Sequence, residues 1–223
     1  MTLYFLIFGQ LMGDRIGTFH DGVTYMQYIT PGLMMMSIIT STYGNASSSF
    51  FFVRFNGAVE EMLVSPMPNW AILLGYVTGS VVRGFVVSAI ALLIALFFTS
   101  LHVANPVVAI LSALLGAIIF SLMGFINALF AKTLDDIGHV STFLLTPLAY
   151  LGGVFYPISM LNEPWRHISQ ANPILHMIGA FRYGLLGVGD IDIGFAFCVM
   201  LVLIAGLSTS ALVLLKRGVG NKS

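Results

Sequence analysis

Residues 147–187, PLAYLGGVFYPISMLNEPWRHISQANPILHMIGAFRYGLLG, decide how the chain should be arranged. An apolar run ends at Pro157, and two short pieces follow it, beginning at Pro164 and Pro173. Neither piece is long enough to cross a bilayer, because a spanning helix needs about 20 apolar residues. Both pieces are nevertheless rich in aliphatic and aromatic side chains. A re-entrant or interfacial helical hairpin over residues 157–187 fits this pattern best.

The composition places the rest of the chain in a membrane. Of the 223 residues, 58% are hydrophobic and only 8% are charged, whereas soluble domains carry roughly 25% charged residues. A soluble protein of this composition could not cover its surface with polar groups, so the sequence predicts an integral membrane protein. The formal net charge is zero, which argues against a nucleic-acid partner. The single cysteine, Cys198, cannot form a disulfide within the chain.

The apolar runs predict an all-α bundle with six spans in one transmembrane domain over residues 1–223. The first run is too short to cross a bilayer alone, so we expect the chain to begin inside a shortened first span. The sequence shows no internal repeat, which argues against an inverted-repeat secondary transporter. The expected spans are residues 1–12 (partial), 25–52, 71–100, 107–130, 137–156 and 193–215.

One face of the second predicted span is polar. Four residues recur there at every fourth position, and such residues share one face of a helix; they are Ser37, Ser41, Asn45 and Ser49. A face of hydroxyls and an amide suits packing against another helix, or a polar path, better than it suits lipid. The sequence leaves both interpretations open, and this face is the candidate translocation surface.

The segment that follows this span is amphipathic. Apolar residues fall there at helical spacing and two acids lie on the other side, which is typical of a helix at the membrane surface. Such a helix is either a solvated connector or a docking helix for a soluble partner. The apolar residues are Phe55, Val59, Met62 and Leu63, the acids are Glu60 and Glu61, and the segment ends at Ser65 and Pro66.

Lysine and arginine residues are biased toward one side of the predicted membrane. A cytoplasmic C-terminus puts more of them inside than outside, as the positive-inside rule requires. This orientation places the hairpin on the outer face and the amphipathic segment in the cytoplasm. The inner set is Arg54, Lys132, Lys216, Arg217 and Lys222, and the outer set is Arg15, Arg166 and Arg182.

Two arginines fall within apolar helices. Arg83 follows the motif Gly75-x-x-x-Gly79, which permits close helix approach, and its charge must either snorkel to an interface or find a partner. We expect it to snorkel. Arg182 is expected to pair with Glu163 or Asp190, or to bind an anionic lipid or substrate group, and a structural pair is favoured.

Common catalytic motifs are missing from the sequence. It contains no GxxxxGK[ST], so the chain cannot bind ATP through a P-loop, and it contains neither HExxH nor GxSxG. The spacing of Glu163, His167 and His176 fits no familiar metal site, so no metal or cofactor is expected. Together with Arg182, these residues form the polar cluster of an alternative interpretation, an intramembrane enzyme that acts on lipid at the outer face.

Four stretches resemble the membrane subunit of bacterial ABC-2 type exporters, and the resemblance extends over essentially the whole chain. They are YITPGLMMM at 28–36, EEMLVSP at 60–66, FAKTLDD at 130–136, and PLAYLGGVFYP at 147–157 combined with Asn172-Pro173 and FRYG at 181–184.

The resemblance implies a permease with six transmembrane helices and two short outer re-entrant helices between the last two. Such permeases work as dimers in the bacterial inner membrane, and each half binds a separate ATPase subunit. The segment with Glu60, Glu61, Met62, Leu63, Ser65 and Pro66 resembles the coupling helix that contacts the ATPase. The corresponding hairpin residues are Gly152, Gly153, Pro157, Pro173, Phe181, Arg182 and Tyr183.

The beginning of the sequence departs from this family pattern. Members begin with a cytoplasmic amphipathic helix and a complete first span, whereas here only residues 1–12 correspond to that region. An inactive, truncated permease paralogue is therefore a further alternative.

Overall fold

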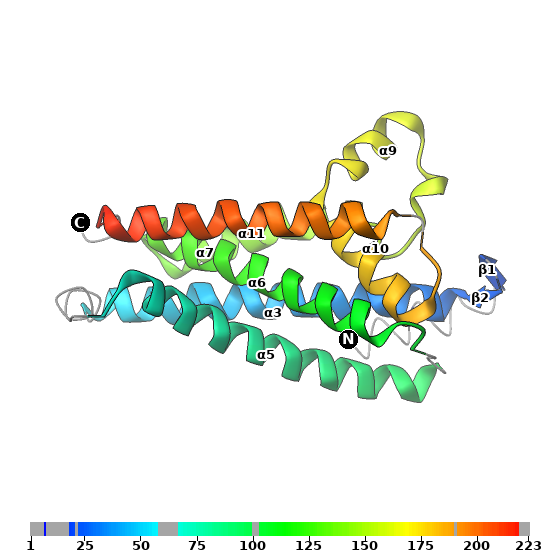
Figure 1. The fold of residues 1–223 in the computed structure, drawn as a ribbon, viewed down its shortest axis with the longest axis horizontal. Helices are drawn as coiled ribbons and strands as arrows, with labels where there is room; N and C mark the ends of the chain where they lie inside the picture. Colours follow the sequence, from blue (N-terminus) through cyan, green and yellow to red (C-terminus); the bar gives the residue numbers. More distant parts are fainter. Residues whose placement is uncertain are drawn as a thin grey trace.

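Four long helices form the body of the computed structural model (Figure 1). The structure describes Ile7 and residues 18–20, 22–57, 67–99, 103–189 and 191–218. The long helices are α3 (Tyr25–Phe55), α5 (Asn69–Phe98), α6 (Pro106–Phe130) and α11 (Ile193–Lys216). Helices α3, α6 and α11 run in the same direction along the bundle, α5 runs in the opposite direction, and the segment over residues 134–151 leads back along the bundle before α11.

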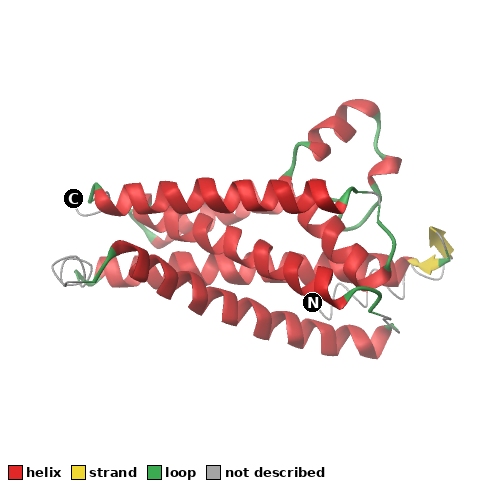
Figure 2. Ribbon diagram, in the orientation of Figure 1, coloured by secondary structure: helices red, strands yellow, loops and turns green. Residues whose placement is uncertain are grey.

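Shorter elements connect these helices (Figure 2). Two strands, β1 (Thr18–His20) and β2 (Val23–Thr24), pair antiparallel before α3. The connection from α6 to α11 contains α7 (Leu134–Val140), the π-helical turn η2 (Ser141–Leu145), α8 (Thr146–Leu151), the 3-10 turn η3 (Ile158–Met160), α9 (Glu163–Gln170) and α10 (Pro173–Leu186).

Local sequence sets the beginnings of the main helices. Thr24 and Gln27 form a capping box at the start of α3, in which each side chain accepts a hydrogen bond from the backbone N–H of the other residue. Asn172 and Asp192 cap α10 and α11 through their side-chain oxygens. Pro106 opens α6, where its missing N–H is not needed.

Helices α5, α6 and α11 are long and apolar enough to cross a membrane, and the prediction of an integral membrane protein is confirmed. Helix α3 is as long, with 31 residues, but it is not one of the three candidate spans among the described residues. Its hydroxyl and amide side chains lower its hydropathy. The prediction of six spans is therefore not confirmed.

The predicted fifth span is shorter and more irregular than expected. Residues 134–151 are helical, but η2 interrupts the α-helical pattern, and Thr146 donates its hydroxyl to the carbonyl oxygen of Ser141, five residues earlier, at 3.1 Å. The helix ends at Leu151, before the predicted end at residue 156. The reason is Gly153, whose φ of +72° leaves the helical region.

The core lies mainly between α3 and α6, the pair of helices that packs most extensively. A Cβ atom at Gly124 of α6 would collide with the carbonyl oxygen of Tyr43, so glycine permits this close approach. Asn127 donates its Nδ2 to the hydroxyl of Tyr43 at 2.7 Å. The same face of α6 carries Gly116, where a Cβ would lie 3.3 Å from the sulfur of Met35.

We predict that Gly124→Ala lowers the thermal stability of the purified protein, because the added methyl group forces α3 and α6 apart. Overpacking of this kind costs about 1–3 kcal/mol. Gly206→Ala in α11 is the matched control, because a Cβ there meets nothing within 4 Å. Midpoints of heat-induced aggregation in dodecyl maltoside compare the two variants. Equal midpoints would contradict the close contact at Gly124.

Candidate functional site

The turn after α8 is packed into a corner between α3 and α10. A Cβ at Gly32 of α3 would lie 2.8 Å from the carbonyl oxygen of Val154, and a Cβ at Gly152 would lie 2.8 Å from the side chain of Ile174. Tyr25 donates its hydroxyl to the carbonyl oxygen of Phe155 at 3.3 Å. The turn that opens the predicted hairpin is thus fixed to the bundle by glycine contacts and by a hydrogen bond.

Arg182 of α10 joins this turn to α3. Its side chain is only 6% exposed. Its Nη2 donates to the carbonyl oxygen of Gly153 at 2.7 Å, its Nη1 donates to the hydroxyl of Tyr28 at 2.9 Å, and its Nε donates to the carbonyl oxygen of Tyr28 at 3.3 Å. The guanidinium carbon also lies 3.8 Å from the centre of the Tyr28 ring, a cation–π distance. Backbone and phenol oxygens therefore solvate this buried charge.

The two helices of the predicted hairpin have different surroundings. Helix α10 is mostly buried against α6, α11 and α3, whereas α9 projects from the side of the bundle (Figure 1). Each begins next to the expected proline, Pro164 or Pro173. Of the hairpin residues predicted from the sequence, Gly152, Gly153, Pro157, Phe181 and Arg182 are buried, and Pro173 and Tyr183 are half-buried.

The residues of the alternative enzyme cluster lie in two different environments. Glu163 and His167 face each other at 3.2 Å on the exposed α9. His176 is buried on α10, with its Nε2 3.0 Å from the carbonyl oxygen of Gln170, and Arg182 contacts Tyr28 and Gly153. Asp190, the other expected partner of Arg182, lies outside the described residues. Among the described residues, no group of three or more His, Cys, Asp or Glu side chains could hold a metal ion.

The polar face predicted on α3 meets a charged residue of α5. Ser37 is buried and donates to the carbonyl oxygen of Leu33 at 3.1 Å, whereas Ser41, Asn45 and Ser49 are half-buried. Asn45 donates its Nδ2 to the hydroxyl of Ser80 at 3.0 Å and accepts from Nη1 of Arg83 at 2.8 Å. The expectation that Arg83 snorkels is wrong, because it bonds to a neighbouring helix instead.

No pattern in the sequence indicates that Arg83 joins this face. The spacing of residues along α5 shows which of them share a side, but it does not show which side meets α3. The contact depends on Gly84, the next residue, where a Cβ would collide with the side chain of Thr42. This close crossing brings Arg83 next to Asn45.

Basic residues gather at the end of the bundle opposite α9 and α10 (Figure 1), which we call the basic end. Arg54 donates its Nη1 to the carbonyl oxygens of Ala128 and Leu129 at 2.8 and 2.9 Å, and so joins the ends of α3 and α6. Lys132, Lys216 and Arg217 belong to the same end. The predicted coupling residues, Glu60, Glu61, Met62, Leu63, Ser65 and Pro66, follow α3 here but lie outside the described residues.

The loop before α7 is also ordered at the basic end. The carboxylate of Asp136 accepts hydrogen bonds from the backbone N–H groups of Lys132 and Thr133 at 2.8 and 2.9 Å. These bonds, of which the one from the Lys132 N–H has the largest effect, hold the pKa of Asp136 below its usual value. Asp135 and Asp136 lie in the first turn of α7, where negative charges interact favourably with the helix dipole.

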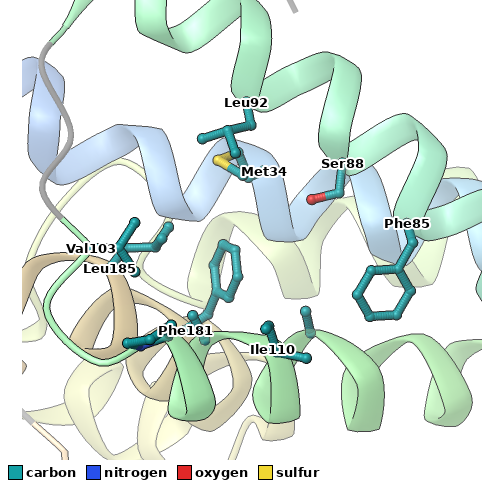
Figure 3. A pocket seen from close by; sticks show the side chains of 11 residues that line it. Met34, Phe85, Ser88, Leu92, Val103, Ile110, Phe181 and Leu185 are labelled. Carbon is teal, nitrogen blue, oxygen red and sulfur yellow. The ribbon is translucent and has the colours of Figure 1, made fainter.

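An apolar cavity of about 270 Å³ lies between α3, α5, α6 and α10 (Figure 3). Its lining includes Met34, Phe85, Leu92 and Phe181, and its one hydroxyl comes from Ser88. None of the described residues that line it is ionisable. Such a cavity suits a hydrocarbon chain and offers no group for acid–base chemistry.

Comparison with known proteins places the chain in a family. A family model, ABC-2 type transporter, matches residues 1–186. The chain belongs to the ABC-2 type transporter family. It is 48% identical to the inner membrane transport permease YadH of Escherichia coli (strain K12), over 100% of this chain and 87% of that protein. It is also 26% identical to nodulation protein J of Rhizobium meliloti (strain 1021), over 94% of this chain and 81% of that protein. No solved structure matches the chain.

We predict that Arg182→Gln destabilises this permease-family protein by roughly 2–4 kcal/mol, because it removes charge-assisted hydrogen bonds to Tyr28 and Gly153 from a buried site. Tyr28→Phe removes one hydroxyl but keeps the aromatic ring, so its effect should be about 1 kcal/mol. Arg166→Gln on the exposed α9 is the control. Thermal unfolding midpoints in detergent rank the three variants. If Arg182→Gln lowers the midpoint no more than Arg166→Gln does, the structural role of Arg182 is contradicted.

Proposed function

We propose that this chain is the membrane-spanning permease subunit of an ATP-binding cassette exporter in the bacterial inner membrane. Family membership over residues 1–186 carries the proposal. The sequence contains no P-loop motif, so the energy of ATP has to come from a separate ATPase subunit. The likeness to a relative named as an inner membrane transport permease supports the same assignment.

The distribution of charge supports an orientation with the basic end in the cytoplasm. Arg54, Lys132, Lys216 and Arg217 lie at this end, and short cytoplasmic segments are enriched in such residues. The amphipathic segment at 58–66 follows α3 at the same end, so this orientation presents it to a cytoplasmic ATPase. Arg54 fixes the end of α3 to α6, so force applied to this segment would reach the core of the bundle.

The translocation path in this proposal runs along the polar face of α3, between two copies of the chain. Ser41, Asn45 and Ser49 are half-buried in the single chain. On α5, a Cβ added at Gly75 or at Gly79 would meet no other atom within 4 Å, which leaves room for a helix of a second copy to approach. A homodimer would cover this polar surface, which lipid solvates poorly.

The hairpin belongs to the outer side of the membrane in this arrangement. Helices α9 and α10 lie at the end opposite the basic end, and we infer that they form the re-entrant element between the last two of six spans. The hydrogen bonds from Arg182 to Tyr28 and Gly153 would then hold the outer end of α3 to α10. A tilt of α3 driven from the cytoplasm would move this outer contact as part of a rigid body.

We predict that Glu60→Lys and Leu63→Asp abolish association with the ATPase while the chain still inserts into the membrane. The first variant reverses a charge of the amphipathic segment, and the second places a carboxylate on its apolar side. The tagged chain is purified from the bacterial membrane in mild detergent, the associated proteins are identified by mass spectrometry, and ATP hydrolysis is measured. A P-loop ATPase that hydrolyses ATP should accompany the wild-type chain and neither of these two variants.

Glu163→Lys provides the matched control, because it reverses an exposed carboxylate at the opposite end of the bundle. This variant should retain the ATPase. Retention of the ATPase by both Glu60→Lys and Leu63→Asp would contradict the coupling role of residues 58–66. Absence of any ATPase from the wild-type complex would contradict the proposed function itself.

A further inference from the structure

A guanidinium group lies midway along a helix that is long and apolar enough to cross the membrane. Arg83 is the central residue of α5, which has 30 residues, and at 1.5 Å per residue it lies about 20 Å from either end. The residue is exposed in the single chain. A charge at this depth is costly in hydrocarbon, so it marks a polar environment or a functional partner.

The neighbours of Arg83 are neutral and offer few acceptors. Asn45 accepts one hydrogen bond from Nη1 at 2.8 Å, and within the described part of the chain it is the acceptor that Arg83 contacts. A guanidinium has five N–H donors, so most of them remain available. The adjacent hydroxyl of Ser80 donates to the carbonyl oxygen of Tyr76 in its own helix and accepts from Asn45.

Among the described residues, the long helices offer no carboxylate at this depth. Helices α3, α5, α6 and α11 contain no aspartate or glutamate. A second copy packed against this face therefore cannot neutralise Arg83 from its long helices, and two copies would bring two positive charges toward one path. The nine acids of the sequence are Asp14, Asp21, Glu60, Glu61, Asp135, Asp136, Glu163, Asp190 and Asp192.

Arg182 shows how this protein satisfies an arginine whose role is to hold helices together. Arg182 is enclosed by a phenol ring, a hydroxyl and two carbonyl oxygens. Arg83 is open on the side that faces away from Asn45. Gly75, Gly79 and Arg83 lie in a row on one face of α5, and the two glycines have no side chains. A ligand can therefore approach the guanidinium along this row.

We propose that Arg83 binds the anionic group of an amphiphile midway across the membrane, and that Asn45 orients its guanidinium. The proposal rests on the proposed function, since it assigns an acidic, amphiphilic class of substrate to the permease. A phosphate, sulfate or carboxylate supplies the missing negative charge and matches the forked N–H groups of arginine. The apolar surface of α5 on either side of Arg83 accommodates the hydrocarbon part.

Binding of ³²P-labelled dodecyl phosphate to the purified full-length chain in dodecyl maltoside tests this site directly. The neutral detergent is present in large excess, so the signal depends on the anionic group and not on the alkyl chain. Unlabelled laurate, another anionic amphiphile, should compete with the probe. Dodecyltrimethylammonium and inorganic phosphate at the same concentration should compete poorly, since the first lacks the negative charge and the second lacks the alkyl chain.

Substitutions at Arg83 separate its charge from its hydrogen bond. Arg83→Gln keeps a donor for Asn45 but loses the charge, and should weaken binding about tenfold or more. Arg83→Lys keeps the charge and should stay within about threefold of the wild-type affinity. The control is Thr78→Val, which changes an exposed residue of the same helix whose hydroxyl bonds to its own backbone and should bind normally.

Equal binding by the wild type and Arg83→Gln would overturn the proposal. Competition by inorganic phosphate as strong as that by laurate would also overturn it, since the ligand would then be a free anion. If Arg83→Gln instead separates the dimer without changing affinity for the probe, this face is only an interface between subunits. The assay contains no ATPase, so a chain that binds the probe but captures no ATPase would retain this site and lose the proposed function.

Discussion

A charge buried among membrane helices has to be surrounded by oxygen atoms, and the end of the bundle that carries α9 and α10 is built around one such charge. Arg182 contacts Tyr28 on α3 and Gly153 in the turn after α8. This requirement fixes α10 against α3 and holds the turn at a depth where free backbone carbonyls would be costly. Gly32 and Gly153 then permit the close packing that places the oxygens within reach.

The arginine midway along α5 has different surroundings, and this difference is the basis of the proposed ligand site. Arg83 touches one amide oxygen and is exposed, although it lies at the centre of a helix apolar enough to span the membrane. Asn45, on the polar face of α3, is the residue that meets this charge. Polar groups on a surface at this depth are compatible with a path shared by two subunits, and incompatible with contact to lipid alone.

Composition and helical spacing predicted much of this molecule. The membrane assignment, the boundaries of α6 and the two short helices that begin near Pro164 and Pro173 all follow from local patterns. The pairing of Arg83 with Asn45 could not be predicted, because it depends on how two helices far apart in sequence rotate against each other. The early end of α8 depends on the positive φ of Gly153, which the sequence permits without requiring it.

Site-specific crosslinking tests most directly whether residues 58–66 couple this chain to an ATPase. A photoreactive benzoylphenylalanine replaces Met62 in one sample and Trp165, on α9 at the opposite end, in another. Illumination of intact cells followed by mass spectrometry identifies the captured protein. The proposed arrangement predicts a crosslink to a P-loop ATPase from position 62 and none from position 165. A crosslink to that ATPase from position 165 alone, or from neither position, would contradict it.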